Sequence, residues 1–487
     1  MRYLLPARPL AALRPSTREP GAGAVLEPDG TSIVETRGGP LAVHGATGAW
    51  ALLDPGELEI LTALGGRTAE GAAAATGRSP EAVGRFAREL WARGLVSAAG
   101  IRSLDADRID EEIRAIGRRT FVLVLSLASG CNLACRYCYW GQATPHPVER
   151  MDASLAEAIL VRAIDRAVDR VVVDFGEVAA AEDLFRRLAR FARDRATRTG
   201  RELHLLVQTN GTRLAPEFVR FLAEQGVQAG VSLDGPARLN DRARVFRNGR
   251  GAHSPAVEGV RRLVGEGVGT WLVATIGRHN VAEPEGVVGE LLELGASDHV
   301  FKPVLPLGDA GGSWRELGIE VDEFRAFLAR AVRFALGRSL DDLDLSRRNL
   351  LFRALGDARG WANPCISRRC GCGTGRVVVE SNGSRSPCPR FPGVRPAGDG
   401  PSLEVEVPPA IFALPGECER CPWLGACGGG CPLGAAGGAA WSSAGTALDP
   451  HCGSYRTSFE VLFDEVVPRL VAGVASGSIG PCALVSR

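Results

Sequence analysis

The stretch from Phe121 to Cys138 reads FVLVLSLASGCNLACRYC and joins a run of apolar β-formers to three closely spaced cysteines. The run Phe121–Leu127 is typical of a buried strand. Cys131, Cys135 and Cys138 follow it on the next loop. Three thiolates within eight residues can bind three irons of a [4Fe–4S] cluster and leave the fourth iron open to a substrate or cofactor. A zinc site is the alternative, but zinc normally takes four ligands and no fourth lies nearby.

Apolar, β-rich runs alternate with helix-like stretches from this strand onward. The predicted strands are Phe121–Leu127, Arg170–Phe175, Leu203–Gln208, Ala229–Leu233, Trp271–Ile276 and His299–Pro303. Such alternation predicts parallel strands joined by right-handed helical crossovers. Six repeats fall short of the eight of a closed barrel, so we expect an α/β fold with a partial (β/α)6 barrel. Catalytic groups of such folds lie at the carboxyl ends of the strands, where the cysteine loop begins.

Composition narrows the class of protein. The chain has 487 residues and a net charge of +1, with 45% hydrophobic and 23% charged residues. This balance is ordinary for globular domains and gives no electrostatic reason to expect a nucleic-acid or membrane partner. No apolar run approaches the roughly 18 residues of a spanning helix, and no secretory signal opens the chain. We therefore expect a cytoplasmic protein.

The thirteen cysteines gather in groups, which in a long chain without an export signal indicates metal binding more than disulfides. Two groups follow the predicted barrel. The first group comprises Cys365, Cys370, Cys372 and Cys388, and the second comprises Cys418, Cys421, Cys427, Cys431 and Cys452. One three-cysteine cluster and two fully ligated four-iron clusters would use eleven cysteines. A pair of four-cysteine zinc sites is the alternative.

Residues from about 20 to 100 have the outline of a winged helix. Short β-like pieces precede the helix start Asp54-Pro55, and two further helices and an extended piece follow. Such modules bind DNA or capture a peptide along a sheet edge. Four arginines near the last helix are weak support for DNA binding, so peptide capture is favoured, and a structural cap is the remaining alternative.

The CxxxCxxC motif resembles that of the radical S-adenosylmethionine (SAM) superfamily. Tyr137 before the last cysteine also fits that motif, and Thr209-Asn210-Gly211 and Ser232-Leu233-Asp234-Gly235 resemble stretches common in its peptide-modifying branch. The resemblance implies that Cys131, Cys135 and Cys138 are catalytic and hold a cluster whose open iron binds SAM. Reductive cleavage of SAM would then give a 5′-deoxyadenosyl radical. The residues that it implies for SAM binding are Tyr137, Gly176, Glu177, Asn210, Ser232 and Arg244.

One stretch departs from the family pattern. The family usually has Gly-Gly-Glu-Pro after the second strand, whereas this chain reads Phe175-Gly176-Glu177-Val178. Gly176 and Glu177 match the middle pair, and the first Gly and the Pro are missing. Backbone carbonyls can still accept hydrogen bonds there, because they need no particular side chain.

The later cysteines resemble the SPASM auxiliary-cluster domain. Cys372, ten residues, Gly383, four residues and Cys388 match its first part, and the spacing from Cys418 to Cys431 matches its second. The resemblance implies two further [4Fe–4S] clusters. One would take Cys372, Cys388, Cys431 and either Cys365 or Cys370, with Cys365 preferred. The other would take Cys418, Cys421, Cys427 and Cys452.

The N-terminal module resembles the PqqD-like elements that bind leader peptides. The predicted organisation is a recognition module over 20–100, a radical SAM barrel over 118–310, a helical linker over 311–360, a SPASM domain over 361–455 and a C-terminal helix and tail over 456–487. We therefore expect a radical SAM oxidoreductase that crosslinks a ribosomally made precursor peptide through a thioether or C–C bond. Its electron donor would be a flavodoxin or ferredoxin.

Two alternatives remain. One is a sulfatase-maturase-like enzyme that forms formylglycine, a family in which an Asp general base follows the cysteine that Cys388 matches. Here Pro389 follows it, and proline cannot take a proton. The other is a redox-sensing DNA-binding regulator, for which eleven cluster cysteines and a full βα array are more than is needed.

Overall fold

The chain forms two compact units in the computed structural model. The first comprises Met1–Ile116, Leu350–Cys370 and Pro409–Arg487, and the second comprises Gly117–Asn349 and Gly371–Pro408. The structure describes residues 20–21, 23–103, 111, 119–138, 140, 148–306, 308–338, 372–373, 375–389, 401–405, 407, 412–431, 448–449 and 452–468. The predicted Cys-rich segment over 361–455 therefore contributes to both units.

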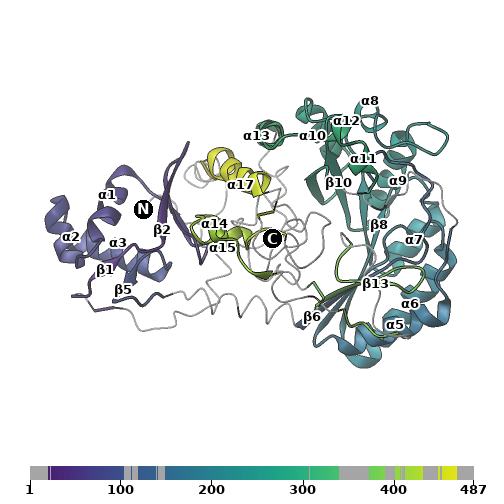
Figure 1. The fold of residues 1–487 in the computed structure, drawn as a ribbon, viewed down its shortest axis with the longest axis horizontal. Coiled ribbons are helices and arrows are strands. Elements are labelled where there is room, and N and C mark those ends of the chain that lie inside the picture. Colours follow the sequence, from purple (N-terminus) through teal and green to yellow (C-terminus); the bar gives the residue numbers. More distant parts are fainter. Residues whose placement is uncertain are drawn as a thin grey trace. The chain divides into compact units, whose positions relative to one another are not determined.

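Six parallel strands form the centre of the second unit (Figure 1). They are β6 (Thr120–Leu125), β7 (Arg170–Asp174), β8 (Glu202–Thr209), β9 (Val227–Ser232), β10 (Thr270–Ile276) and β11 (Asp298–Pro303). Each strand pairs in parallel with the next along the chain. The predicted partial parallel barrel is confirmed.

Helices join these strands and lie along the outer side of the sheet (Figure 1). They are α5 (Ala153–Arg166), α6 (Glu182–Thr199), α7 (Pro216–Glu224), α8 (Ala237–Asn240), α9 (His253–Gly265) and α10 (Pro284–Glu293), followed by α11 (Asp309–Gly312), α12 (Trp314–Leu317) and α13 (Val321–Arg338). The Asp152 carboxylate caps α5 by accepting the Leu155 N–H, which satisfies a donor left free at the helix start. Gly200 ends α6 in the left-handed region, at φ 67°.

The two faces of the sheet differ in burial. Val171 and Val173 on β7 are fully buried beneath the helices, whereas Val172 and Asp174 are only partly covered. The same period-two pattern recurs along β8. Because side chains alternate between faces, the residues of the inner face line the open interior of the partial barrel. A ligand bound at the carboxyl ends of the strands would meet these inner residues.

A hairpin from the Cys-rich segment extends this sheet. β12 (Arg376–Val379) pairs in parallel with β6, with Val379 opposite Leu125, and β13 (Arg385–Ser386) pairs with β12. Gly383 lies in the hairpin turn at φ 78°, a conformation that favours glycine. Cys372 and Cys388 flank the hairpin, so its pairing with the sheet positions both cysteines at the sheet's edge.

A small mixed module begins the first unit. Its elements are β1 (Leu26–Glu27), β2 (Thr31–Thr36), β3 (Gly39–His44), β4 (Trp50–Leu52), α1 (Pro55–Leu64), α2 (Ala69–Thr76), α3 (Pro80–Ala92) and β5 (Ser97–Ala98). The strands β2, β3 and β4 form an antiparallel sheet in that order. Asp54 and Glu57 form a reciprocal capping box at the start of α1. Among the described strands, only β3 pairs with β2, so the other edge of β2 has no strand partner.

The C-terminal segment packs against this module. It contains α14 (Gly416–Glu419), α15 (Leu424–Cys427) and α17 (Cys452–Val461), which continues as a π-helical turn over Leu462–Val466. Trp423 stacks on Phe463, whose ring also meets Trp50 edge-on at 4.9 Å between centroids. The Gly425 N–H donates to the Gly45 carbonyl at 2.6 Å. The N-terminal module and the second cysteine group therefore share one packed unit.

His44 makes the stability of this unit sensitive to acid. Its buried ring accepts the Thr47 N–H at Nδ1 (3.2 Å), which requires a neutral ring. Burial, and then the charge of Arg102, lowers the pKa of His44 from 6.5 to about 4. Between these values the unfolded chain binds a proton that the folded chain does not, so stability falls as the pH falls through this window. We expect a loss of about 3 kcal/mol across it.

Urea unfolding followed by tryptophan fluorescence, at about pH 7.5 and about pH 4.5, measures this loss. The matched variant is His44→Gln, which has no titrating ring. It should lose clearly less stability than the parent over the same interval. Equal losses in the two proteins would contradict the role given to His44.

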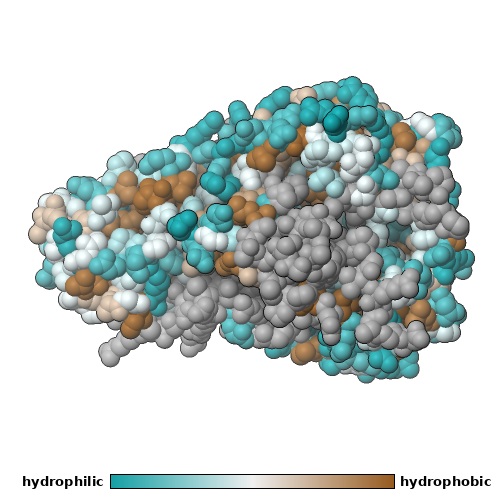
Figure 2. All heavy atoms as spheres, viewed as in Figure 1, coloured by the Kyte–Doolittle hydropathy of each residue, from teal (hydrophilic) through white to brown (hydrophobic). Residues whose placement is uncertain are grey.

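Among the helices that the structure describes, none has the length and apolar character needed to cross a bilayer. On the face drawn in Figure 2, hydrophilic residues predominate over the barrel helices and hydrophobic residues form separate spots. The large exposed apolar side chains include Val25, Ile33 and Ile101 in the first unit and Val148 and Val168 in the second.

Candidate active site and cysteine-lined pocket

The three-cysteine loop lies directly after β6 and is held along its length by a second segment. The Ala134 N–H donates to the Val245 carbonyl at 2.8 Å, and the Arg136 N–H donates to the Ala243 carbonyl at 2.9 Å. The Cys138 carbonyl accepts the Asp309 N–H at 2.9 Å. These bonds run through the backbone, so they hold the loop whatever its side chains bind.

The three thiols are partly buried and influence one another. Burial raises the pKa of Cys135 to about 11, with the neighbouring Cys138 and Cys131 adding to the rise and Arg244 opposing it. Burial, followed by the charge of Glu177, also raises the pKa of Cys131. Thiolates crowded in this way become stable when positively charged irons neutralise them.

Asn210 brings the loop after β8 to the cysteine loop. Its Nδ2 group donates to the Asn132 side chain at 2.9 Å and points at the Cys131 sulfur at 3.5 Å. Asn132 in turn donates to Thr212 at 2.8 Å. Asn210, predicted from the Thr209-Asn210-Gly211 motif, therefore lies beside a predicted cluster ligand.

Glu177 also lies at this edge of the sheet. Its Oε2 accepts the Asn210 N–H at 2.9 Å and the Thr209 hydroxyl at 3.0 Å. Gly176 precedes it at φ 58°, and its N–H donates to Asp174 at 2.9 Å. The altered Gly176-Glu177 stretch thus still places a carboxylate against the loop that carries Asn210.

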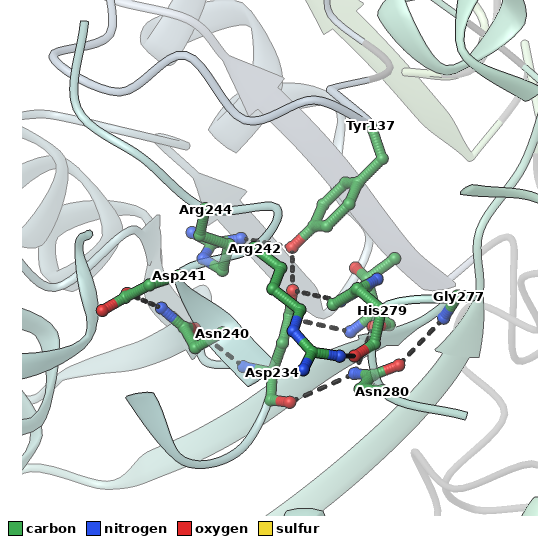
Figure 3. A network of polar contacts seen from close by, with 10 residues as sticks. Tyr137, Asp234, Asn240, Asp241, Arg242, Arg244, Gly277, His279 and Asn280 are labelled. Carbon is green, nitrogen blue, oxygen red and sulfur yellow. Dashed lines mark hydrogen bonds and ion pairs between the residues drawn. The ribbon is translucent and has the colours of Figure 1, made fainter. Parts of the chain in front are cut away.

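A buried polar network anchors the same loop from the other side (Figure 3). The Tyr137 hydroxyl donates to Asp234 and accepts from Arg244 at 2.9 Å. His279 Nε2 lies 3.2 Å from the same Asp234 oxygen, and its ring stacks on Tyr137 at 5.7 Å between centroids. Burial by itself would raise the pKa of Asp234, but the His279 hydrogen bond and the Arg244 charge outweigh it and lower that pKa. Asp234 is therefore an ionised carboxylate inside the protein.

Backbone groups complete the surroundings of Asp234 (Figure 3). Its second oxygen accepts the Thr275 N–H at 3.0 Å, and its own N–H donates to Asn240 at 3.1 Å. Asn280 donates to the Asp234 carbonyl at 3.1 Å. The end of β9, the end of β10 and the cysteine loop therefore meet at a single carboxylate.

Residues 125–291 match the model of the radical SAM superfamily. This range runs from the end of β6 into α10 and contains the three-cysteine loop, Asn210 and the Asp234 network. The chain contains a radical SAM domain.

Two curated relatives overlap this domain. The serine-type anaerobic sulfatase-maturating enzyme of Klebsiella aerogenes is 27% identical over 341 residues, which are 65% of this chain and 81% of that protein. The pre-heme d1 synthase of Dinoroseobacter shibae is 32% identical over 225 residues, which are 45% of this chain and 52% of that protein.

Two solved structures share the fold. Native anSMEcpe with bound AdoMet superposes with a TM-score of 0.59 at 22% identity, covering 73% of this chain and 99% of that one. SuiB of Streptococcus suis bound to its precursor peptide SuiA superposes with a TM-score of 0.51 at 16% identity, covering 88% of this chain and 99% of that one.

A radical SAM domain implies one [4Fe–4S] cluster and SAM, and the residues present fit both. Three neighbouring thiols on one clamped loop match a cluster with one open iron. Cys131, Cys135 and Cys138 would hold this cluster. Ser232 ends β9 opposite Val273 and is half-buried, so it lies at the carboxyl edge where SAM would bind. Tyr137 belongs to the cysteine loop itself, and its hydroxyl accepts a hydrogen bond from Arg244.

The first auxiliary ligand set is only partly described. Cys372 and Cys388 are both buried at the ends of the β12–β13 hairpin. Cys365 and Cys370 lie outside the described residues, and Cys431 belongs to the other unit. This set of ligands therefore stays a prediction.

The second auxiliary ligand set lines one pocket. Its wall includes all four predicted ligands, namely Cys418, Cys421, Cys427 and Cys452. Between Cys427 and Cys431 stand three successive glycines, all with φ between 70° and 84°. Only glycine adopts this conformation readily, so the run Gly428–Gly430 lets the chain curl tightly between two cysteines. In the part of the chain that the structure describes, no three Cys, His, Asp or Glu side chains converge as they would on a single metal ion.

Sequence reasoning missed several residues of both sites. The motif that contains Asp234 assigns it no role, and no sequence pattern marks His279 or Asn280. Asp449, in the wall of the cysteine-lined pocket, belongs to no motif either. The one available signal was that Asp234 follows a strand directly, where parallel sheets place functional side chains.

Proposed function

We propose that this radical SAM chain is a maturase that modifies a side chain of a ribosomally made precursor peptide and forms a thioether or C–C crosslink. The observation that carries the proposal is the clamped loop of Cys131, Cys135 and Cys138 at the carboxyl edge of the parallel sheet. The bound cluster and SAM would supply a 5′-deoxyadenosyl radical, which takes a hydrogen atom from the peptide. Crosslinking then releases one proton and one electron, so the peptide loses two hydrogens in all.

We further propose that two auxiliary [4Fe–4S] clusters accept this electron and pass it to a flavodoxin or ferredoxin. The pocket lined by Cys418, Cys421, Cys427 and Cys452 supports the second of them. Trp423, in the wall of that pocket, stacks on the rings of Phe459 and Phe463 and so holds the pocket in place. The peptide-recognition module is built onto the same packing through Trp50.

Peptide capture is supported by the edge of β2 that no described strand covers. An extended leader could add a strand there, because backbone groups along an unpaired edge are ready to form a ladder. SuiB, solved with its precursor peptide, is matched over 88% of this chain, whereas about a quarter of this chain has no counterpart in anSMEcpe. The pre-heme d1 synthase of Dinoroseobacter shibae matches less than half of this chain.

Ile33 on β2 offers a test of this capture. Its side chain is 41% exposed although it is apolar. We expect Ile33→Asp to weaken binding of the precursor peptide about tenfold, because a carboxylate removes apolar contact beside the added strand. The probe is the peptide encoded by a short reading frame beside the gene, and fluorescence anisotropy gives its affinity. The matched control is Val168→Asp, an exposed valine of the other unit that should leave the affinity unchanged.

A sulfatase-maturase activity is the second candidate, favoured by the Klebsiella relative and by the anSMEcpe fold. It would oxidise a Cys or Ser side chain to formylglycine, whose aldehyde reacts with hydrazides. Pro389 after Cys388 stands where that family has its Asp base, so this chain would need another base.

One experiment separates the two candidates. The anaerobically reconstituted chain is given SAM, a strong reductant and either the precursor peptide or a sulfatase-derived peptide. Loss of two hydrogens from the precursor without hydrazide labelling supports crosslinking. Hydrazide labelling of the sulfatase peptide would refute the crosslinking proposal and support a sulfatase-maturase activity.

A further inference from the structure

The pocket lined by the second cysteine group also contains two oppositely charged residues. Asp449 and Arg456 lie in its wall together with the four cysteines. Asp449 is 3% exposed, whereas Arg456 is exposed on the surface of α17. Water therefore screens the charge of Arg456, whereas the charge of Asp449 is largely shielded from water.

Asp449 is held in place by donors that its carboxylate accepts. Its Oδ2 accepts the Cys431 N–H at 2.7 Å and the Tyr455 hydroxyl at 2.9 Å. A Cβ at Gly430 would lie 2.9 Å from the Asp449 Cβ, and Gly430 has a φ of 75°. Glycine at this position therefore lets the cysteine loop approach the carboxylate closely.

Both charges act on the cysteine sulfurs. They line one pocket together with the four cysteines, so the field of each charge reaches the sulfurs. Asp449 thus opposes added negative charge in the pocket, and Arg456 favours it. Reduction of an iron–sulfur cluster adds one negative charge, so the same two residues would act on reduction in opposite directions.

We propose that Asp449 lowers the reduction potential of the cluster in this pocket and that Arg456 partly offsets it. The inference rests on the proposed function, which assigns that cluster to Cys418, Cys421, Cys427 and Cys452. Asp449 is a positioning and tuning residue: it bonds to the backbone of the cysteine loop and touches no substrate. A low potential at this cluster favours passing an electron onward over keeping it.

The test uses full-length chain with Cys131, Cys135 and Cys138 replaced by alanine, so that only auxiliary clusters contribute. Asp449→Asn and Arg456→Gln are made in this background, reconstituted anaerobically and titrated potentiometrically with EPR detection. Asp449→Asn should raise the reduced-to-oxidised ratio of one cluster about tenfold at fixed potential, a shift of about 59 mV to more positive values. Arg456→Gln should shift the same signal to more negative values, by less because Arg456 is exposed.

The control is Asp165→Asn, which removes an exposed carboxylate of the other unit and should shift neither signal. Unchanged midpoints in both pocket variants, with iron content equal to the parent, would overturn the inference. If Asp449→Asn fails to hold its cluster, the sign of the Arg456→Gln shift decides. A parent that binds no iron beyond the background would instead overturn the proposed function of these cysteines.

Discussion

Replacing Cys131, Cys135 and Cys138 together with alanine is expected to reduce 5′-deoxyadenosine formation to the level of a reaction without protein. The loop would keep its backbone bonds to Ala243 and Val245, so the fold should survive. What is lost is every thiolate that would hold the proposed SAM-binding cluster. Anaerobic reconstitution with SAM and a strong reductant, followed by mass spectrometry of 5′-deoxyadenosine, measures the effect.

A second variant shows whether the loss is specific to this loop. Cys418→Ala/Cys421→Ala removes two of the four predicted ligands of the cysteine-lined pocket and should leave SAM cleavage without peptide largely intact. Iron content should fall by about 4 atoms per chain from about 12 in either variant. Product formed by the parent would show that the altered stretch around Gly176 supports cleavage. Product formed equally by the triple-alanine variant would refute the assigned role of these cysteines.

The barrel could be predicted because each of its strands is recognisable from its own stretch of sequence. Runs such as Arg170–Phe175 are apolar, short and bounded by helix signals, and each requires only its own neighbours in sequence. The parallel pairing of β12 with β6 was not predictable in this way. Its partners Val379 and Leu125 lie more than 250 positions apart, and a four-residue strand carries no mark of the edge it will join.

The candidate site likewise contains parts that could be predicted from local sequence and parts that could not. The cysteine loop, Asn210 and Gly176-Glu177 follow strand ends in recognisable patterns, and the structure brings them together. Tyr137, Asp234 and Arg244 were among the predicted residues or motifs, but no sequence pattern shows that they meet His279, because these residues come from separate loops. Only the folded chain shows that their polar groups meet at one carboxylate.

Asp234→Asn is expected to destabilise the barrel unit far more than removal of a surface carboxylate does. Asp234 is fully buried, Tyr137 is half-buried and Arg244 is only 6% exposed, so the guanidinium relies on the carboxylate to balance its charge. Arg244 reaches Asp234 through the Tyr137 hydroxyl, and removing the carboxylate leaves its buried charge uncompensated, which costs about 3–5 kcal/mol. An Asn amide would also present hydrogens to donors that need an acceptor. Urea unfolding of the cluster-free chain at neutral pH measures the loss.

The matched control is Asp165→Asn, which removes a carboxylate that interacts with an arginine of the same unit at the surface. Asp165 accepts from Arg195 at 2.6 Å, but both side chains are more than a third exposed. Such pairs contribute about 0–1 kcal/mol, because water and salt screen them. A double variant, Asp234→Asn/Arg244→Met, should recover part of the stability that Asp234→Asn loses, since it removes the stranded charge. If Asp234→Asn and Asp165→Asn cost the same, Asp234 does not hold the strand ends and the cysteine loop together, and the loop must rely on its backbone bonds alone.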